Sequence, residues 1–218
     1  RPDGAAVWKK PYVVDAFLGI RGAIPLAETQ TEVMLRVIHH FHQQSSSSPK
    51  LRWMDLGCGS GVLGLTLNQA YPKSDGILFD FSEPMLEEAR KNVVRRQEQQ
   101  QLDKKANDDN DDGTIDVIQG DFSTSQWMDA TKGALDVIVS GFAIHHQPDE
   151  RKKELYNEIH TVLAPGGIFL NIEHVSSPDE ELEAIFEHTF IDAMMKWYEG
   201  RRSIQQVQEQ FFGREDKG

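Results

Sequence analysis

Apolar residues along this chain gather in short runs, separated by longer stretches in which they recur at helical spacing. The runs fall near residues 51–56, 76–80, 115–118, 135–140 and 167–174. Each run has the length of a buried strand, and the stretches between them have the three-to-four-residue spacing of amphipathic helices. Strands that alternate with helices predict an α/β fold, namely a doubly wound, mostly parallel, Rossmann-like sheet with helices on both faces.

The ends of the chain differ in pattern from its middle. Residues 1–27 carry scattered aromatic groups with proline and glycine, which predicts one short helix and a loop, and Thr29-Gln-Thr-Glu32 has the pattern of a capping box that opens the next helix. We therefore expect an N-terminal segment (1–27), one α/β domain (28–200) and a helical tail (201–218). Residues 97–113 are almost wholly polar, which predicts a surface insertion too polar to order itself.

The most specific chemistry lies where the first strand ends. Asp55 is followed by Gly57, Gly59 and Gly61 at alternate positions, with Cys58 among them. Glycine allows positive φ and a close approach of a ligand to the backbone. The helix that follows points its N-terminus at that ligand. This strand, turn and helix predict the site of a nucleoside-bearing cofactor.

Two classes of cofactor fit the turn. Gly59-Ser-Gly61-Val-Leu-Gly64 matches the dinucleotide fingerprint, and Asp80 at the end of the second strand suits a ribose in either class. Asp55 would repel a pyrophosphate but attract an ammonium group, and Asp121 adds a third carboxylate after the third strand. The carboxylates favour a cofactor with an ammonium group and no phosphate. An NAD(P)-binding oxidoreductase remains the alternative.

Five motifs stand in order along the chain. They are Asp-Leu-Gly-Cys-Gly-Ser-Gly (55–61), Phe-Asp-Phe-Ser-Glu-Pro-Met-Leu (79–86), Gln-Gly-Asp-Phe (119–122), Asp-Val-Ile-Val-Ser (136–140) and Leu-Ala-Pro-Gly-Gly (163–167). Together they resemble the motifs of class I S-adenosylmethionine-dependent methyltransferases, over roughly residues 28–196. Within that class the chain resembles small-molecule enzymes of the "methyltransferase domain" type. The resemblance implies S-adenosyl-L-methionine as cofactor and S-adenosyl-L-homocysteine as product.

The resemblance also implies roles for single residues. It assigns Asp55 and Gly57 to the methionine end of the cofactor, Asp80 to the ribose hydroxyls and Asp121 to the adenine amino group. The full cofactor-binding set that it implies is Asp55, Gly57, Cys58, Gly59, Gly61, Asp80, Phe81, Met85, Gly120, Asp121, Phe122, Ser140, Gly141 and Phe142. For each aspartate the alternative role is a turn or helix cap.

Candidate catalytic groups follow the fourth and fifth strands. His145 and His146 come after the fourth, and Glu173 and His174 end the fifth. An imidazole can take a proton from a hydroxyl, thiol or ammonium acceptor. Alternatively, one histidine caps the next helix and the other packs under the cofactor. Methyl transfer is an in-line displacement that depends mainly on positioning, and a base is needed only for a protonated acceptor. We expect no metal site.

The resemblance carries two further expectations. Related enzymes fold the N-terminal region over the cofactor as a lid, here with Trp8, Tyr12, Phe17 and Arg21, although a helix packed on the sheet fits the pattern equally. The class also has a sixth and a seventh strand, and the residues after Trp197 predict neither. The tail is then expected to be truncated. The open sheet edge would favour a homodimer.

Composition narrows the class of partner. The net charge of −12 disfavours a large nucleic-acid surface, and no apolar run approaches the length of a membrane span. The single cysteine, Cys58, excludes a disulfide framework and favours a cytoplasmic protein, although a targeting segment could precede Arg1. We expect a small-molecule acceptor. A non-catalytic cofactor-binding protein on the same fold is the third alternative.

Overall fold

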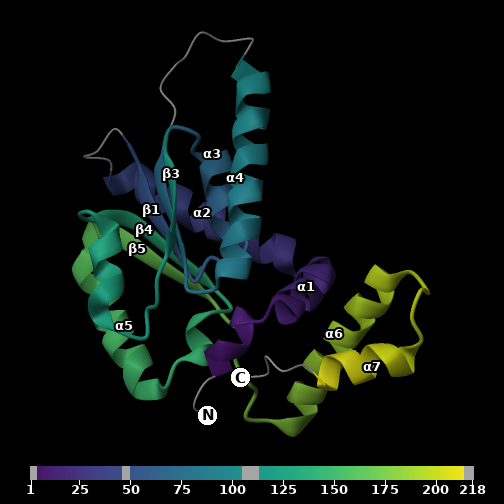
Figure 1. Ribbon diagram of the computed structural model, residues 1–218. Coiled ribbons are helices and arrows are strands. Elements are labelled where there is room, and N and C mark those ends of the chain that lie inside the picture. Colours follow the sequence, from purple (N-terminus) through teal and green to yellow (C-terminus); the bar gives the residue numbers. More distant parts are fainter. Residues whose placement is uncertain (1–3, 46–49, 105–112, 214–218) are drawn as a thin grey trace.

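A five-stranded sheet forms the centre of the computed structural model, which describes residues 4–45, 50–104 and 113–213 (Figure 1). Neighbouring strands are all parallel, in the order β3-β2-β1-β4-β5. The strands are β1 (Arg52–Leu56), β2 (Asp75–Asp80), β3 (Ile115–Gln119), β4 (Leu135–Gly141) and β5 (Leu163–Ile172). The predicted doubly wound α/β fold is confirmed.

Helices cover both faces of this sheet. The α-helices are α1 (Pro11–Ile20), α2 (Ala27–Ser45), α3 (Val62–Ala70), α4 (Glu83–Lys104), α5 (Asp149–Val162), α6 (Glu180–Tyr198) and α7 (Ile204–Phe212). Short 3₁₀ helices are η1 (Gly4–Lys9), η2 (Arg21–Ala23), η3 (Ser125–Thr131) and η4 (Ile144–His146). Helices α2, α3 and α4 pack on one face, and α5 with η3 packs on the other.

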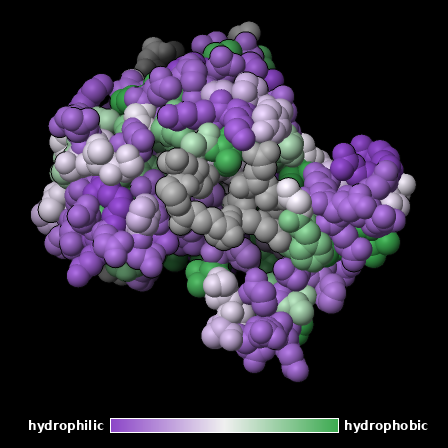
Figure 2. Space-filling view, turned by 60° about the horizontal axis from the view of Figure 1, so that its bottom comes forward, coloured by the Kyte–Doolittle hydropathy of each residue, from purple (hydrophilic) through white to green (hydrophobic). Residues whose placement is uncertain are grey.

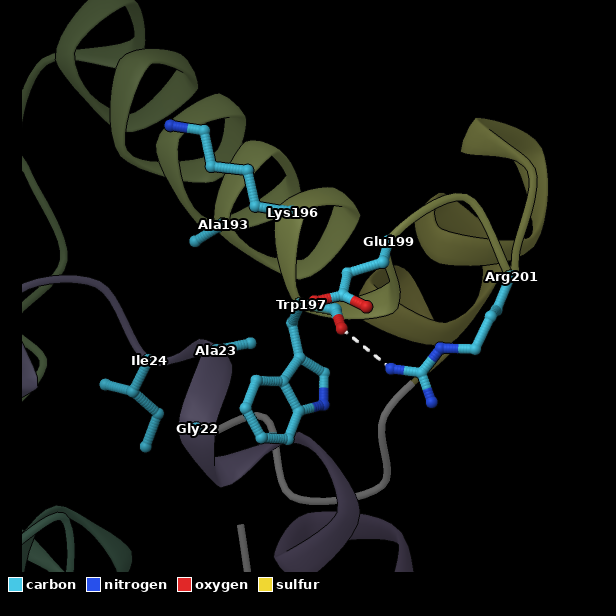
Figure 3. A pocket seen from close by; sticks show the side chains of 8 residues that line it. All are labelled: Gly22, Ala23, Ile24, Ala193, Lys196, Trp197, Glu199 and Arg201. Atoms are coloured by element: carbon cyan, nitrogen blue, oxygen red, sulfur yellow. Dashed lines mark hydrogen bonds between the residues drawn. The ribbon is translucent and has the colours of Figure 1, made fainter.

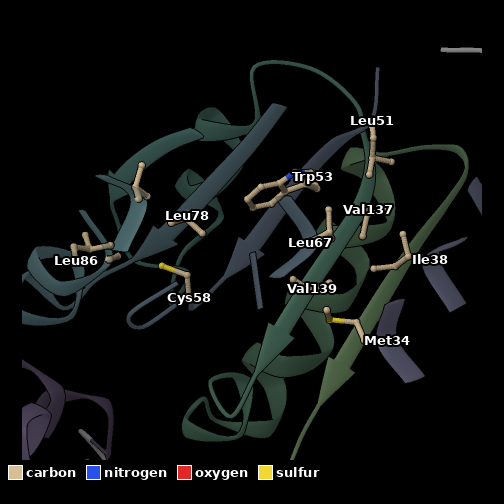
Figure 4. Close-up of a cluster of buried hydrophobic side chains, with 12 residues drawn as sticks. Met34, Ile38, Leu51, Trp53, Cys58, Leu67, Leu78, Leu86, Val137 and Val139 are labelled. Carbon is tan, nitrogen blue, oxygen red and sulfur yellow. The ribbon is translucent and has the colours of Figure 1, made fainter. Parts of the chain in front are cut away.

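The core divides into two hydrophobic layers because side chains alternate along each strand. On β1, Trp53 lies in the layer under α2, α3 and α4, whereas Met54 and Leu56 lie in the layer under α5. Figure 4 shows the first layer, in which Trp53 from β1 lies among Leu67 and Val137 of neighbouring elements. Trp53 is fully buried, and its indole N–H donates to the hydroxyl of Ser74 at 2.8 Å.

Gly76 on β2 leaves the space that the Trp53 ring fills. A Cβ at residue 76 would lie 1.9 Å from a ring carbon of Trp53. Because that ring is held by its own hydrogen bond in a close-packed layer, Gly76→Ala should destabilise the fold by about 1–3 kcal/mol or more. Urea unfolding measures the change. In the matched control Gly19→Ala, the new Cβ meets nothing within 4 Å, so stability should stay unchanged or rise. Equal stability of the two variants would contradict this packing.

Two local predictions are wrong in their boundaries. Helix α2 begins at Ala27 rather than at the predicted capping box, and the Thr31 hydroxyl donates to the Ala27 carbonyl instead of capping. Helix α4 continues to Lys104, so residues 97–104 of the predicted insertion are helical. Their Gln, Glu, Leu and Lys side chains have high helix propensity. The rest of the predicted insertion, 105–112, lies outside the described residues.

Helices α6 and α7 pack away from the sheet, beside the N-terminal segment (Figure 1). We call their joint hydrophobic core the cap cluster; its buried members are Ile20, Ala23, Ile191, Met194, Tyr198, Val207 and Phe211. The predicted helical tail is present as α7, which opens with a capping box between Ser203 and Gln206. We expected α6 within the α/β domain. It instead packs against both the N-terminal segment and α7.

Strand β5 is an edge of the sheet, and the described residues after it contain no sixth or seventh strand, as predicted. The first half of α6 exposes Leu182, Ile185 and Phe186, each about half accessible to solvent. The described residues thus keep the arrangement of a doubly wound sheet and pair no further strand with the outer edge of β5.

Candidate functional site

The glycine turn lies at the point where the chain leaves β1 in one direction and β4 in the other, the usual place for a ligand in such sheets. Gly57, Gly59 and Gly61 have φ of +75°, +52° and +83°, values that favour glycine. The N–H groups of Gly57 and Cys58 both donate to the carbonyl of Phe79, at 2.8 and 3.0 Å. The turn is therefore fixed to the end of β2.

A side chain at Gly57 would also collide with the loop that follows β4. Its Cβ would lie 2.4 Å from the Cβ of Ala143 and 3.2 Å from the ring of Phe122. The turn and the residues before η4 thus touch directly. Two segments that are more than eighty residues apart in sequence meet at the carboxyl edge of the sheet.

Asp55 is buried at the base of this turn. Its Oδ2 accepts a hydrogen bond from the N–H of Gly64 at 2.8 Å. Its Oδ1 receives no hydrogen bond from any described residue. Burial raises the pKa of Asp55 to about 7, and the nearby charge of Asp80 adds to the shift. A buried carboxylate oxygen without a donor is unfavourable, and an ammonium group of a ligand would satisfy it.

Asp80 holds the turn from the end of β2. Its two carboxylate oxygens accept hydrogen bonds from the N–H groups of Gly59 and Ser82, each at 2.8 Å. Burial raises the pKa of Asp80, and the charge of Asp121 raises it further. Asp80 therefore does cap the turn, which was the alternative role considered for it. This role does not exclude a ligand, because each carboxylate oxygen can accept more than one hydrogen bond.

The third carboxylate, Asp121, is exposed and accepts a hydrogen bond from the N–H of Ser123 at 2.7 Å. Its charge acts on Asp80, and that of Asp80 acts on Asp55. The structure thus brings the three predicted carboxylates to one edge of the sheet. No cation in the described residues pairs with Asp55 or Asp80 by an ion pair, so the site gathers negative charge.

The other predicted cofactor residues divide between the turn and the core. Phe122 is buried in the α5 layer, and Met85 is buried with its sulfur facing Gly59. A Cβ at Gly120 would lie 2.4 Å from the Phe79 ring, so close packing requires glycine there. Phe81 is half-buried, with the ammonium of Lys9 5.6 Å from its ring centre.

Cys58 is buried within the turn, and burial raises the pKa of its thiol well above the usual value. The neighbouring Asp55 and Asp80 charges raise the pKa further. A thiol that stays protonated is a poor nucleophile. Cys58 therefore serves the turn as a small buried side chain.

Residues at the end of β4 mainly support the backbone. The Ser140 hydroxyl, expected in the cofactor-binding set, is fully buried and donates to the carbonyl of Leu56 at 2.7 Å, which ties β4 to β1. Gly141 lies against Leu63, because a Cβ there would be 2.7 Å from its side chain. Phe142 has a positive φ of +53°, and its N–H donates to the carbonyl of Ile172.

The four candidate catalytic residues do not form one cluster. His145 and Glu173 pair directly, with Nδ1 and Oε2 2.6 Å apart. His146 instead accepts a hydrogen bond at Nε2 from the indole of Trp8, at 3.1 Å. His174 is exposed, and among the described residues no hydrogen bond joins its ring to that pair. Within the described part of the chain, no group of three potential metal ligands comes together.

The N-terminal segment reaches the turn at two places. The carbonyl of Trp8 accepts a hydrogen bond from the hydroxyl of Ser82 at 2.5 Å. The guanidinium of Arg21 donates to the hydroxyl of Ser60, which lies between two of the turn glycines. Sequence reasoning missed Ser60 and Ser82, although their places inside the first two motifs could have marked them. In this arrangement the segment lies over the carboxyl edge of the sheet.

A hollow of about 550 Å³ opens beside this edge, between η2 and the C-terminal end of α6 (Figure 3). It is lined by Gly22, Ala23, Ile24, Ala193, Lys196, Trp197, Glu199 and Arg201. The Trp197 ring lies against Gly22, and the Arg201 guanidinium donates to the Trp197 carbonyl at 2.9 Å. None of the predicted site residues lines the hollow. It belongs to the junction between the N-terminal segment and α6.

The surface on this side of the molecule is mainly hydrophilic. Figure 2 shows hydrophobic side chains there only in small, separate groups. None of the helices described here is long and apolar enough to cross a membrane.

A family model described as "Methyltransferase domain" matches residues 54–167, more than half of the chain. The match begins on β1, includes the glycine turn and all three carboxylates, and ends on β5. The chain therefore belongs to this family of class I S-adenosylmethionine-dependent methyltransferases.

Two curated relatives match parts of the chain. The chain is 27% identical over 139 residues to the ubiquinone/menaquinone biosynthesis C-methyltransferase UbiE of Ruegeria sp. (strain TM1040). This alignment covers 64% of the chain and 48% of that protein. It is 26% identical over 132 residues to the carboxy-S-adenosyl-L-methionine synthase of Chromohalobacter salexigens, covering 60% of this chain and 42% of that protein. The matches thus span less than half the length of either relative.

A solved structure supports the fold. The structure described as a DhpI–SAM–HEP complex aligns with a TM-score of 0.52 at 15% sequence identity. The alignment covers 85% of this chain and 72% of that one. At this identity the similarity concerns the fold alone.

Proposed function

We propose that the protein binds S-adenosyl-L-methionine at the glycine turn and transfers its methyl group to a small-molecule acceptor. The observation that carries the proposal is the buried Asp55 carboxylate, whose Oδ1 has no hydrogen-bond donor among the described residues. A ligand ammonium at this position would supply both the missing donor and a counter-charge. Membership of the methyltransferase domain family supports the same cofactor.

The remaining residues of the site fit the rest of such a cofactor. Asp80 would accept hydrogen bonds from ribose hydroxyls, and Asp121, exposed beyond β3, would accept one from an adenine amino group. Gly57 and Gly59 leave room for the ligand to approach the backbone. The bound cofactor supplies a methyl group on a positively charged sulfur, which a nucleophile displaces in line. The chain's own task is to position the acceptor and exclude water.

Charge and surface support a small acceptor. The chain carries a net charge of −12, and the coloured side chains visible in Figure 2 are mainly hydrophilic. A polyanionic acceptor such as nucleic acid would be repelled by this charge. Trp8 and Phe17, which pack edge to face at 5.1 Å beside His146, could contribute apolar surface to an acceptor pocket.

Isothermal titration calorimetry with S-adenosylmethionine, S-adenosylhomocysteine and NADH tests the cofactor. We expect the first two to bind and NADH not to bind, because the charge of Asp55 would repel its pyrophosphate. Tight NADH binding without a response to the other two would replace this proposal with the dinucleotide alternative.

Release of S-adenosylhomocysteine in the presence of pooled metabolite acceptors tests the transfer. The same pools with a variant that cannot bind the cofactor provide the background rate. Cofactor binding without turnover of any pool would favour a non-catalytic cofactor-binding protein.

A further inference from the structure

His145 and Glu173 form a pair with the geometry of a base and its orienting carboxylate. Glu173 follows β5 and is largely buried, with a side-chain exposure of 11%. Its Oε1 accepts hydrogen bonds from the N–H groups of Ile144 and His145, at 2.9 and 3.2 Å. Its Oε2 lies 2.6 Å from Nδ1 of His145. The backbone of η4 therefore fixes the carboxylate, and the carboxylate fixes the ring.

This contact determines which nitrogen of His145 carries the proton. A carboxylate accepts hydrogen bonds, so the neutral ring must place its proton on Nδ1. Nε2 then holds a lone pair, and no described residue donates a hydrogen bond to it. The side chain keeps 25% of its surface exposed, so the ring is not sealed off from an acceptor.

His146 has the opposite arrangement. Its Nε2 accepts the indole N–H of Trp8 at 3.1 Å, so the lone pair on that nitrogen is occupied by the N-terminal segment. The rings of His145 and His146 lie 4.0 Å apart and tilted by 46°. His146 thus supports the neighbouring ring and anchors Trp8, whereas His145 presents an available base.

The position of the pair relative to the glycine turn follows from three contacts. Ala143, directly before η4, packs against Gly57 in the turn. Trp8 links His146 to Ser82, since its indole donates to the first and its carbonyl accepts from the second. Ser82 in turn donates its N–H to Asp80. The pair and the proposed cofactor site therefore share one rim at the carboxyl edge of the sheet.

From this geometry we infer that His145 is the general base of the transfer, that Glu173 is its positioning residue, and that the acceptor carries a proton on the attacked oxygen or nitrogen. The inference rests on the proposed function. As the acceptor attacks, its O–H or N–H bond breaks and the proton goes to Nε2 of His145. The acceptor's electron pair forms the new bond to the methyl carbon, and the C–S bond breaks with its pair on sulfur. The imidazolium then returns its proton to solvent.

Nitrogen NMR of the histidine side chains tests the pair without any acceptor. In the wild-type protein at pH 8, His145 should carry its proton on Nδ1 and leave Nε2 unprotonated. In Glu173→Gln, the glutamine oxygen still accepts the two backbone N–H groups, and its NH₂ then faces Nδ1. Nδ1 must become the acceptor, so the proton should move to Nε2. His146→Gln is the matched control and should leave the His145 tautomer unchanged.

Kinetics with simple probes tests the role in transfer. Phenol and the ammonium form of benzylamine carry a proton that must leave the attacked atom, whereas pyridine is unprotonated near neutral pH and exposes a lone pair. We expect turnover of the first two, and a fall in kcat of about 10²–10⁴-fold in His145→Gln. The kcat of Glu173→Gln should fall to a similar degree, because in this variant His145 has the wrong tautomer. The Kd for S-adenosylmethionine should stay within about twofold in both variants, and His146→Gln should lose less than tenfold in kcat.

The outcomes separate this inference from the proposed function. Absence of S-adenosylmethionine binding in the wild-type protein would reject the proposed function itself. With binding intact, a proton on Nε2 of His145, or an unchanged tautomer in Glu173→Gln, would overturn the pair. Turnover confined to pyridine would overturn the acceptor class. If no probe turns over, the His145 tautomer measured by NMR decides alone whether the pairing of His145 with Glu173 stands.

Discussion

Replacing Asp55 with Asn is expected to stabilise the free protein at pH 8 while weakening its binding of S-adenosylmethionine. The carboxyl is buried, and burial raises its pKa to about 7 from an ordinary value of 3.8. Between these two values the folded state binds a proton that the unfolded state has lost. Stability therefore falls as the pH rises from about 4 to about 7 and stays low above that.

The size of this effect follows from the shift. About three pH units correspond to roughly 4 kcal/mol, and relaxation around the charge would reduce this to roughly 2–4 kcal/mol. The Asn side chain still accepts the N–H of Gly64 but carries no charge. Asp55→Asn should thus gain most of this energy at pH 8 and almost none at pH 4. Urea unfolding at the two pH values measures it, and Asp149→Asn, at an exposed site, is the control.

The same carboxyl should make cofactor affinity depend on pH. Between pH 5.5 and 7 the ligand ammonium is charged, and it binds the ionised form of Asp55. The Kd of the wild-type protein should therefore fall by up to about tenfold per pH unit over this range. In Asp55→Asn the Kd should be weaker and nearly independent of pH. A pH-independent Kd in the wild-type protein would contradict the assignment of Asp55 to the ammonium.

The second large effect is expected at Asp80, where replacement by Ala should abolish measurable cofactor binding. The change removes the proposed ribose acceptor and leaves the N–H groups of Gly59 and Ser82 without their partner. Each unsatisfied N–H would destabilise the fold by about 1–3 kcal/mol. Calorimetric titration gives the loss of binding, and circular dichroism at the titration temperature verifies that the variant is folded.

A matched control lies at the other end of the same strand. Asp75 begins β2 and accepts hydrogen bonds from the N–H and hydroxyl of Thr114, besides pairing with Lys50. Asp75→Ala should lose stability without losing cofactor affinity. If Asp75→Ala and Asp80→Ala lost affinity equally, the effect would be one of stability, and Asp80 would have no direct role in binding.

Much of the fold, and the placement of the carboxylates in the proposed cofactor site, was predictable because the signals in the sequence are local. The strands are short apolar runs, the turn is marked by three glycines, and Asp55 and Asp80 stand at strand ends. Parallel strands bring such ends together at one edge, so a linear pattern suffices to predict that these carboxylates are neighbours.

The sequence pattern does not predict which side chains form hydrogen bonds with one another. The sequence alone does not distinguish His145 from His146. In the structure His145 pairs with Glu173, whereas His146 accepts a hydrogen bond from the indole of Trp8, 138 residues away. The Ser140 hydroxyl likewise donates a hydrogen bond to the Leu56 carbonyl, which the spacing of apolar residues does not predict. Helical spacing predicted helix α6 but not the elements that pack against it, since an apolar helix face does not indicate which element will cover it.

The cap cluster has a consequence for the order in which the molecule forms during synthesis. Ile20 leaves the ribosome early, whereas its partners Val207 and Phe211 follow almost two hundred residues later. At about 5–20 residues per second, helix α1 waits roughly 10–40 seconds for them. The sheet can assemble in that interval, and the cap closes last. Helices α6 and α7 would then pack against Ile20 and Ala23 last, next to the Arg21 contact with the glycine turn.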